Sequence, residues 1–196
     1  MPPGGSRVVK TVGDYYKRRS RQPEKCPGAP WVAMRFLLVD RILSLEPGRS
    51  ITAIKNVSAA EEYLADHFPG YPVLPGVMML ECLVQTGAWL MRSTEDFRYS
   101  TILLKQAKAL KYNNFVQPGQ TLTVSAAVHE RTDREYVFKG SGTVDGKSTF
   151  SARVTLEQFN LADRNSALAG SDQSRIDEMR GRFSQLWTPA SEREAG

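Results

Sequence analysis

Cysteine and histidine are scarce in this chain of 196 residues, which contains two of each. Cys26 and Cys82 are too few for a disulfide framework or a cysteine-rich metal cluster, so we expect a reducing, cytoplasmic setting and no bound metal. Long hydrophobic runs are missing as well. The most apolar stretch, 77–91, has 15 residues and includes a glutamate and a glutamine, whereas a membrane-spanning helix needs about 20 residues. The first residues also lack the apolar core of a secretory signal.

Acidic residues are few at one end of the chain. The formal net charge is +5, and residues 1–30, with seven basic and two acidic residues, account for all of it. Residues 31–196 contain 19 of each sign. Prolines at 23, 27 and 30 fix the backbone φ and remove hydrogen-bond donors, so 1–30 is predicted to be a basic arm with an extended linker. The arm has neither a glycine-rich phosphate loop nor aromatic stacking platforms, and we expect no nucleic-acid partner.

The middle of the chain combines strand patterns with one helix pattern. Six strand-like runs occupy about 34–43, 50–57, 102–112, 120–130, 134–144 and 147–157. Apolar and polar residues alternate in the last run, and Asp145-Gly146 before it is a strong hairpin signal. The segment from Val77 to Met91 is apolar on every side, which predicts a helix enclosed by the rest of the fold. We therefore expect an α+β fold in which a curved antiparallel sheet wraps around one long buried helix.

The last part of the chain, 158–196, is polar and contains one predicted helix at about 172–186. Ser171 is suited to cap its N-terminus. An apolar stripe along the helix consists of Ile176, Met179, Phe183 and Leu186. We expect this stripe to dock on the body of the protein itself, and a partner-binding helix is the alternative. The predicted organisation is thus an arm and linker (1–30), one folded domain (31–157) and a tail (158–196).

Glu81 and Gln85 are the strongly polar residues near the start of the apolar helix. They are four residues apart and therefore share one face of it. An ionised carboxylate in such surroundings is costly unless it is paired. Glu81 is thus either a buried partner of a cation or backbone donor, or a candidate for acid–base chemistry.

His67 stands just upstream, in a loop whose prolines and glycines restrict the backbone. Such a loop holds a catalytic imidazole well, although it equally suits a structural role. The other histidine, His129, is expected at the surface. Gly76 opens the helix, where the first N–H groups lack internal partners and glycine allows a ligand to come close to the backbone. A carbonyl oxygen bound there would be polarised. Together these features suggest the removal or addition of a proton next to a carbonyl.

These motifs closely resemble a known family. The matching residues are His67-Phe68-Pro69-Gly70, then 72–77, Leu80-Glu81 and Gln85, and the resemblance extends over roughly 34–157. The family is the 3-hydroxyacyl-[acyl-carrier-protein] dehydratases of bacterial fatty-acid synthesis. The resemblance implies the hotdog fold and a hydro-lyase that converts a 3-hydroxyacyl carrier thioester to the trans-2-enoyl thioester. Residues 33–35 and Gln120 depart from the family pattern, but neither departure touches the residues above.

The resemblance also implies a role for each site residue. His67 would take the α-proton, and Glu81 from the other subunit of a homodimer would protonate the departing hydroxyl. The Gly76 N–H would bind the thioester carbonyl, while Gln85 and Phe68 would support the site, Gln85 by holding Glu81 or the leaving water. The acyl chain would be carried on the phosphopantetheine of acyl carrier protein, with no further cofactor. Dimers with shared active sites, assembled as hexamers, are a family expectation.

A cluster of cations points to the acidic carrier protein. Arg98, Lys105, Lys108 and Lys111 lie between Phe97 and His129, a stretch without an acidic residue. We hypothesise that they steer the carrier to the site. An ordinary solvated strand face is the alternative.

Two further functions are compatible with parts of the pattern. One is a hotdog dehydratase or thioesterase acting on coenzyme A or polyketide-carrier thioesters. A thioesterase does not require the pairing of His67 with Glu81, which argues against it. The other is a non-catalytic acyl-binding module.

Overall fold

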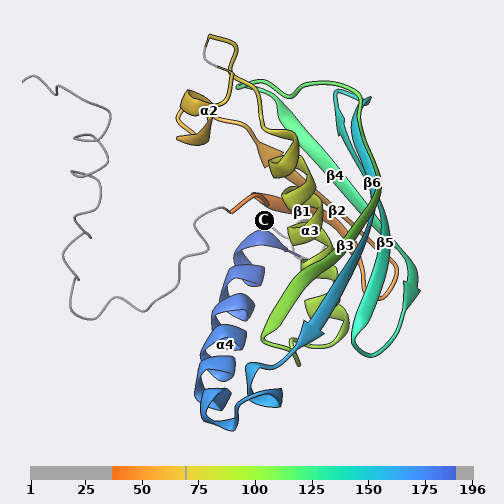
Figure 1. Ribbon diagram of the computed structural model, residues 1–196, viewed down its shortest axis with the longest axis vertical. Helices are drawn as coiled ribbons and strands as arrows, with labels where there is room; N and C mark the ends of the chain where they lie inside the picture. The colour runs from red at the N-terminus through yellow and green to blue at the C-terminus, as the bar shows by residue number, and fades with distance from the viewer. Residues whose placement is uncertain (1–36, 69, 189–196) are drawn as a thin grey trace, which may run out of the picture. The chain divides into compact units, whose positions relative to one another are not determined.

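The computed structural model describes residues 37–68 and 70–188; the basic arm predicted for 1–30 lies outside these ranges. Figure 1 shows the elements in chain order. They are β1 (Arg41–Glu46), β2 (Ser50–Asn56), α2 (Tyr63–Asp66), α3 (Gly76–Thr94), β3 (Thr101–Tyr112), β4 (Thr121–Arg131), β5 (Glu135–Val144), β6 (Lys147–Phe159), the short 3-10 helices η1 (Leu161–Asp163) and η2 (Ser166–Leu168), and α4 (Ala169–Leu186).

The six strands form one sheet in the order β1-β2-β4-β5-β6-β3, and each strand is antiparallel to its neighbours. Side chains alternate between a buried and a more exposed face along β2, β4 and β6, as expected for strands with one face on the core. α3 lies against the buried face of the sheet (Figure 1). The predicted α+β architecture, a sheet around one long helix, is confirmed.

Close contact between α3 and the sheet depends on a missing side chain. A methyl group on Gly140 of β5 would lie 2.2 Å from a Cδ atom of Leu83 on α3. Residues 82–91 of α3 are all buried. Its first turn differs, because Val77 is 70% exposed. The prediction that this helix is enclosed on every side is therefore wrong for its first turn.

The first strand begins later than the pattern predicts. Residues 37–39 have no regular structure, and β1 starts at Arg41. The backbone N–H of Leu38 donates to the side-chain oxygen of Gln85 on α3, at 3.0 Å. This donor is therefore bound to the helix rather than to a neighbouring strand.

The C-terminal helix packs on the body of the protein. Phe183 lies between two aromatic rings of the core, 6.0 Å from that of Trp89 and 5.5 Å from that of Phe97. The whole predicted stripe contacts the core, and the expected docking is confirmed. Ser171 is not the cap, because η2 runs directly into α4 and places Leu168 at the N-cap.

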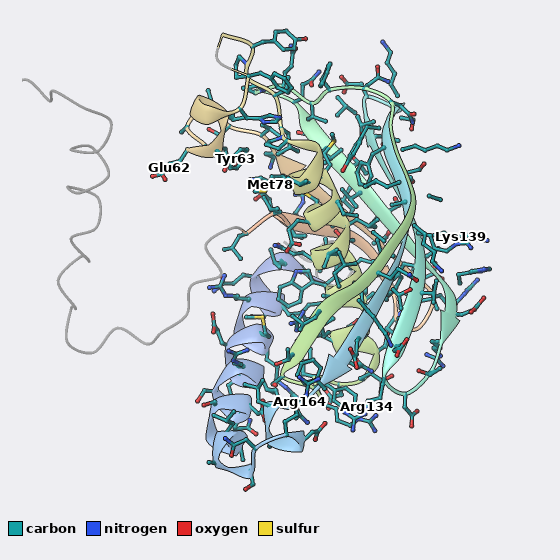
Figure 2. The ribbon with its side chains drawn as sticks, in the orientation of Figure 1. Glu62, Tyr63, Met78, Arg134, Lys139 and Arg164 are labelled. Carbon is teal, nitrogen blue, oxygen red and sulfur yellow. The ribbon has the colours of Figure 1, made fainter. Side chains whose placement is uncertain are left out.

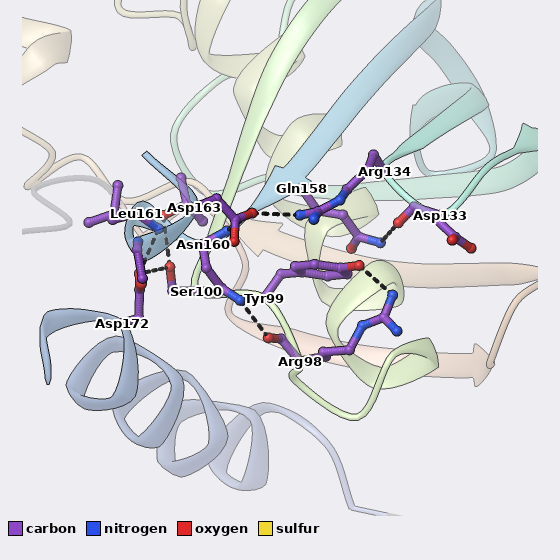
Figure 3. A network of polar contacts seen from close by, with 12 residues as sticks. Arg98, Tyr99, Ser100, Asp133, Arg134, Gln158, Asn160, Leu161, Asp163 and Asp172 are labelled. Atoms are coloured by element: carbon purple, nitrogen blue, oxygen red, sulfur yellow. Dashed lines mark hydrogen bonds and ion pairs between the residues drawn. The ribbon is translucent and has the colours of Figure 1, made fainter. Parts of the chain in front are cut away.

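A buried carboxylate fixes the start of α4. Asp172 accepts hydrogen bonds from the hydroxyl of Ser100 and from the backbone N–H groups of Leu161 and Ala162. Figure 3 shows its carboxylate beside Ser100 and Leu161. Burial alone would raise the pKa of Asp172, but these hydrogen bonds outweigh it and hold the pKa below its ordinary value of 3.8. The ionised carboxylate therefore joins α4 to the segment before β3 and to the turn after β6.

Candidate active site

A cavity of about 420 Å³ lies at the N-terminal end of α3. Four stretches of the chain line it: the loop after α2, the residues leading into α3, the first turn of α3, and the end of β3 with the residues that follow. The lining residues are His67, Phe68, Val73, Leu74, Gly76, Val77, Met79, Tyr112, Asn113, Asn114 and Phe115. The structure thus brings together three predicted site residues, namely His67, Phe68 and Gly76.

His67 is held between a short helix and a tight turn. It follows α2 directly with an extended backbone (φ −107°, ψ 111°). Phe68 has φ 52°, an uncommon value for a residue other than glycine, and its ring meets the imidazole edge-on, with the ring centres 4.4 Å apart. The Phe68 carbonyl accepts a hydrogen bond of 2.8 Å from the N–H of Tyr71. Strained backbone of this kind is often found at functional sites, and here it directly follows the imidazole.

Gly76 is the first residue of α3 and lies beneath an aromatic ring. No hydrogen-bond acceptor for its backbone N–H, or for that of Val77, is recorded within the described residues. These donors sit at the positive end of the helix dipole. A methyl group on Gly76 would lie 2.8 Å from Cζ of Tyr112. The close ring explains glycine at this position. Partial burial in turn raises the pKa of Tyr112.

Glu81 and Gln85 do not line the cavity. The Nε2 of Gln85 donates to a carboxylate oxygen of Glu81 at 3.0 Å, and the Oε1 of Gln85 accepts from Leu38. Gln85 is buried, whereas Glu81 is partly accessible. The amide therefore orients the carboxylate. Within one chain, however, Glu81 lies outside the cavity that contains His67.

The four predicted carrier-docking residues differ in their surroundings. Arg98 stacks on the ring of Tyr99, 4.5 Å from its centre, and forms an ion pair of 3.8 Å with Glu95. Lys105 forms an ion pair with Glu135, whose hydrogen bond and charge raise the pKa of this lysine. Two of the four cations thus have carboxylate neighbours.

Lys108 and Lys111 are exposed on β3. The strand register places Lys108 opposite Arg153 of β6, and Arg153 opposite Lys139 of β5. Lys139 projects from the sheet face that is turned away from α3 (Figure 2). Arg153 and Lys139 were not part of the predicted carrier-docking patch. The hairpin signal at 145–146 could have indicated them, because the register that it sets between β5 and β6 places Lys139 opposite Arg153.

Residues 37–68 and 70–188 contain no group of three or more histidine, cysteine, aspartate or glutamate side chains able to hold a metal ion. Burial raises the pKa of the Cys82 thiol to about 12, so this cysteine is a poor nucleophile. None of the helices in these ranges combines the length and apolarity needed to cross a membrane.

The part of the chain that contains this site matches a known protein family. Residues 32–153 match the model of a family described as the FabA-like domain. The 3-hydroxyacyl-[acyl-carrier-protein] dehydratase FabZ of Latilactobacillus sakei (strain 23K) is 42% identical over 120 residues, which are 61% of this chain and 86% of the relative. The protein of the same name from Rickettsia rickettsii (strain Sheila Smith) is 35% identical over 128 residues, or 64% of this chain and 88% of the relative.

A solved structure shares the fold. The dehydratase heterocomplex ApeI:P from Xenorhabdus doucetiae includes a chain that aligns with a TM-score of 0.56 and 14% identity, covering 68% of this chain and 90% of the other. The fold is the hotdog fold, and together with the relatives it defines the class as a hotdog hydro-lyase. Within this class, the chain belongs to the FabA-like family, and its curated relatives are dehydratases of the FabZ type.

Proposed function

We propose that this chain dehydrates 3-hydroxyacyl-[acyl-carrier-protein] to trans-2-enoyl-[acyl-carrier-protein] in fatty-acid biosynthesis, in the cytoplasm. The activity named for its FabZ relatives supports this function. The structural observation that carries it is the cavity in which an imidazole, that of His67, and the N-terminus of α3 at Gly76 lie together. A base beside a carbonyl-binding site is what abstraction of an α-proton requires.

Each proposed site residue performs one step. The Gly76 N–H binds the thioester oxygen and stabilises the negative charge that develops on it. His67 takes the proton from Cα, the Cα–Cβ double bond forms, and the Cβ–O bond breaks as Glu81 gives its proton to the hydroxyl, which leaves as water. Gln85 orients the Glu81 carboxyl group during this transfer. Each proton transfer contributes roughly 100- to 10,000-fold in rate. The chain itself requires no cofactor, because the carrier supplies the phosphopantetheine.

A second copy of the chain completes the site by supplying Glu81. Glu81 is absent from the lining of the cavity in its own chain, which supports this arrangement. β3 is an edge strand of 12 residues, and Leu103 and Leu104 on it are exposed. An exposed edge of this length with apolar side chains favours pairing with another strand. Two apolar residues of the cavity lining, Phe68 and Val77, are exposed too. We take the dimer as the active unit, and a hexamer of three dimers is the family expectation.

The carrier protein docks on exposed cations of the sheet. Lys108, Lys111, Arg153 and Lys139 form the cationic row, and β3 leads from this row to Tyr112 at the cavity. Like charges opposite each other on neighbouring strands are unfavourable, so an acidic partner would relieve their repulsion. Arg98 and Lys105 contribute less to docking, because Glu95 and Glu135 already balance their charges.

The test is a spectrophotometric hydration assay with a trans-2-enoyl carrier thioester. Wild type should be active, whereas His67→Ala and Glu81→Gln should each lose at least about 100-fold in kcat. Full activity in either variant would remove that residue from its assigned role. Release of free thiol by the wild type, without hydration, would identify a thioesterase instead.

A mixing experiment tests the shared site. Equal amounts of His67→Ala and Glu81→Gln are dissociated together and allowed to reassociate. Half of the resulting dimers are mixed, and each mixed dimer has one site with both residues intact, so about a quarter of wild-type activity should return. No recovery in dimers shown to have exchanged subunits would place both residues of a site in the same chain.

A further inference from the structure

A buried ion pair lies beside the proposed catalytic loop. Ile51, Ala53 and Lys55 are at every second position of β2 and all face the core. Only 6% of Lys55 is exposed. Its neighbour on β4, Leu122, is completely buried. A lysine at a core-facing position of a strand is costly unless its charge is paired.

Two carboxylates from different segments supply this pairing. The Nζ of Lys55 lies 2.7 Å from a carboxylate oxygen of Glu61 and 3.7 Å from one of Asp40. The other oxygen of Asp40 accepts a hydrogen bond of 2.6 Å from the backbone N–H of Asn56. The ammonium group therefore joins the segment before β1 to the segment after β2.

Glu61 belongs to the segment that carries His67. α2 begins two residues after Glu61, contains four residues and ends immediately before His67. A helix this short is not stable by itself, so its position depends on attachments to the body. Leu64 of α2 is buried in the core, and Glu61 supplies the charged attachment through Lys55. The adjacent Glu62, in contrast, is exposed and projects away from the body (Figure 2).

Asp40 belongs to the segment that supports Glu81. Two residues before Asp40, the N–H of Leu38 donates to Gln85, and Gln85 donates to Glu81. The charge of Lys55 also acts on the neighbouring thiol of Cys82, where it opposes the rise in pKa caused by burial. The ammonium group thus lies between the supports of both proposed proton-transfer residues.

We propose that Lys55 and Glu61 are positioning residues that hold His67 at the geometry needed for proton abstraction. This inference rests on the proposed function, because it is the proposed function that makes His67 the catalytic base. Neither residue touches the substrate. Their pairing sets where α2 ends, and with it where the imidazole stands relative to Gly76 at the start of α3.

The primary test uses two single variants, Glu61→Gln and Lys55→Met, in the full-length protein. A displacement of about 1 Å in a catalytic group can cost about 100-fold in rate. We therefore expect kcat for hydration of a trans-2-enoyl thioester to fall about 10- to 100-fold in each variant. KM should change less than about threefold, because the thioester-binding groups lie elsewhere.

The matched control is Glu178→Gln on α4. The Glu178 side chain is 22% exposed and pairs with Arg182 at 2.9 Å, which is close to the 23% and 2.7 Å of Glu61 with Lys55. This variant removes a similar ion pair without touching the loop, so it should retain wild-type kcat. An equal loss of kcat in Glu178→Gln would overturn the assignment, because any ion pair would then have the same effect.

The double variant Lys55→Met/Glu61→Gln separates stability from positioning. It leaves no unpaired buried charge, and its thermal stability should exceed that of the less stable single variant. If the pair positions His67, kcat stays low in the double variant. Recovery of wild-type kcat in the double variant, or a wild-type kcat in Glu61→Gln, would overturn the proposal.

Hydrogen exchange of the backbone amides of residues 63–68 provides a readout that does not require activity. We expect exchange at least about tenfold faster in the double variant than in wild type, and unchanged exchange in Glu178→Gln. Unchanged exchange in the double variant would overturn the anchoring, whatever the enzyme does. Faster exchange in a protein that proves inactive on every thioester would support the anchoring and refute the proposed function.

Discussion

Replacing Gly76 by alanine tests the contact at which α3 begins. The added methyl carbon would lie 2.8 Å from Cζ of Tyr112 and 3.0 and 3.2 Å from its two Cε atoms. Carbon atoms in favourable contact are about 3.5–4.0 Å apart. The ring must therefore move by about 0.7 Å or more before the methyl group fits.

The expected loss of stability is small. Overpacking typically costs about 1–3 kcal/mol, but Tyr112 is 46% exposed and its ring can swing toward solvent. We therefore expect about 1 kcal/mol, the lower end of that range. The expected loss of activity is larger, because the methyl group lies beside the N–H proposed to bind the thioester oxygen. Removing one such donor typically lowers kcat about 100- to 1,000-fold.

The assay combines thermal unfolding with hydration kinetics for Gly76→Ala, Tyr112→Ala and the double variant. Without the ring, adding the methyl group should no longer reduce the unfolding temperature. Activity should remain low in the double variant, because the methyl group still hinders the N–H. If Gly76→Ala kept both the kcat and the unfolding temperature of wild type, the contact and the role of Gly76 would both be refuted.

Three further predictions concern other parts of the molecule. The pKa of Asp172 is lowered in the folded state, so its stabilisation is complete above its unfolded value of about 3.8 and is lost as the pH falls through the folded value. Asp172→Asn should therefore lower the unfolding temperature at neutral pH, and a difference that persists in strong acid would contradict this linkage. Lys108→Glu should raise KM several-fold for carrier-linked substrates but not for a short pantetheine thioester. The increase should be larger than that caused by Lys105→Glu. Equal changes in KM with both substrates would exclude docking on this strand. Gly140→Ala should lower the unfolding temperature, because its methyl group would lie 2.2 Å from Leu83, with Gly140→Ala/Leu83→Ala as the check that the overlap is the cause.

Local patterns predicted most of the fold. The strand-like runs predicted at about 102–112, 120–130, 134–144 and 147–157 match β3 to β6 within about two residues at each end. The predicted start of β1 was too early, because the backbone N–H of Leu38 donates to the side chain of Gln85, 47 residues away, and not to a strand. The cap of α4 was wrong because η2 continues directly into the helix, so Ser171 lies inside it. Contacts between distant segments leave no local periodicity.

The candidate site was predictable where its parts are close in sequence. His67 and Gly76 are nine positions apart, and a rigid loop and a helix start are both visible in the residue types. Tyr112 was not indicated, because only the arrangement of β3 against α3 brings its ring over Gly76. Lys55 was missed for a similar reason. Its strand pattern shows a buried position, but its partners come from segments on either side of the β1–β2 hairpin.

Because α4 docks on the core, the end of the family match and the end of the packed core fall at different places in the chain. The match to the family model ends at residue 153, within β6. The apolar core continues beyond it, because Phe183 contacts Trp89 and Phe97, and Trp187 also packs on the core. A chain cut after β6 would uncover these aromatic rings beside the central helix. The packed core therefore extends beyond the segment that matches the family model, and we expect a chain truncated after β6 to be less stable than the full chain.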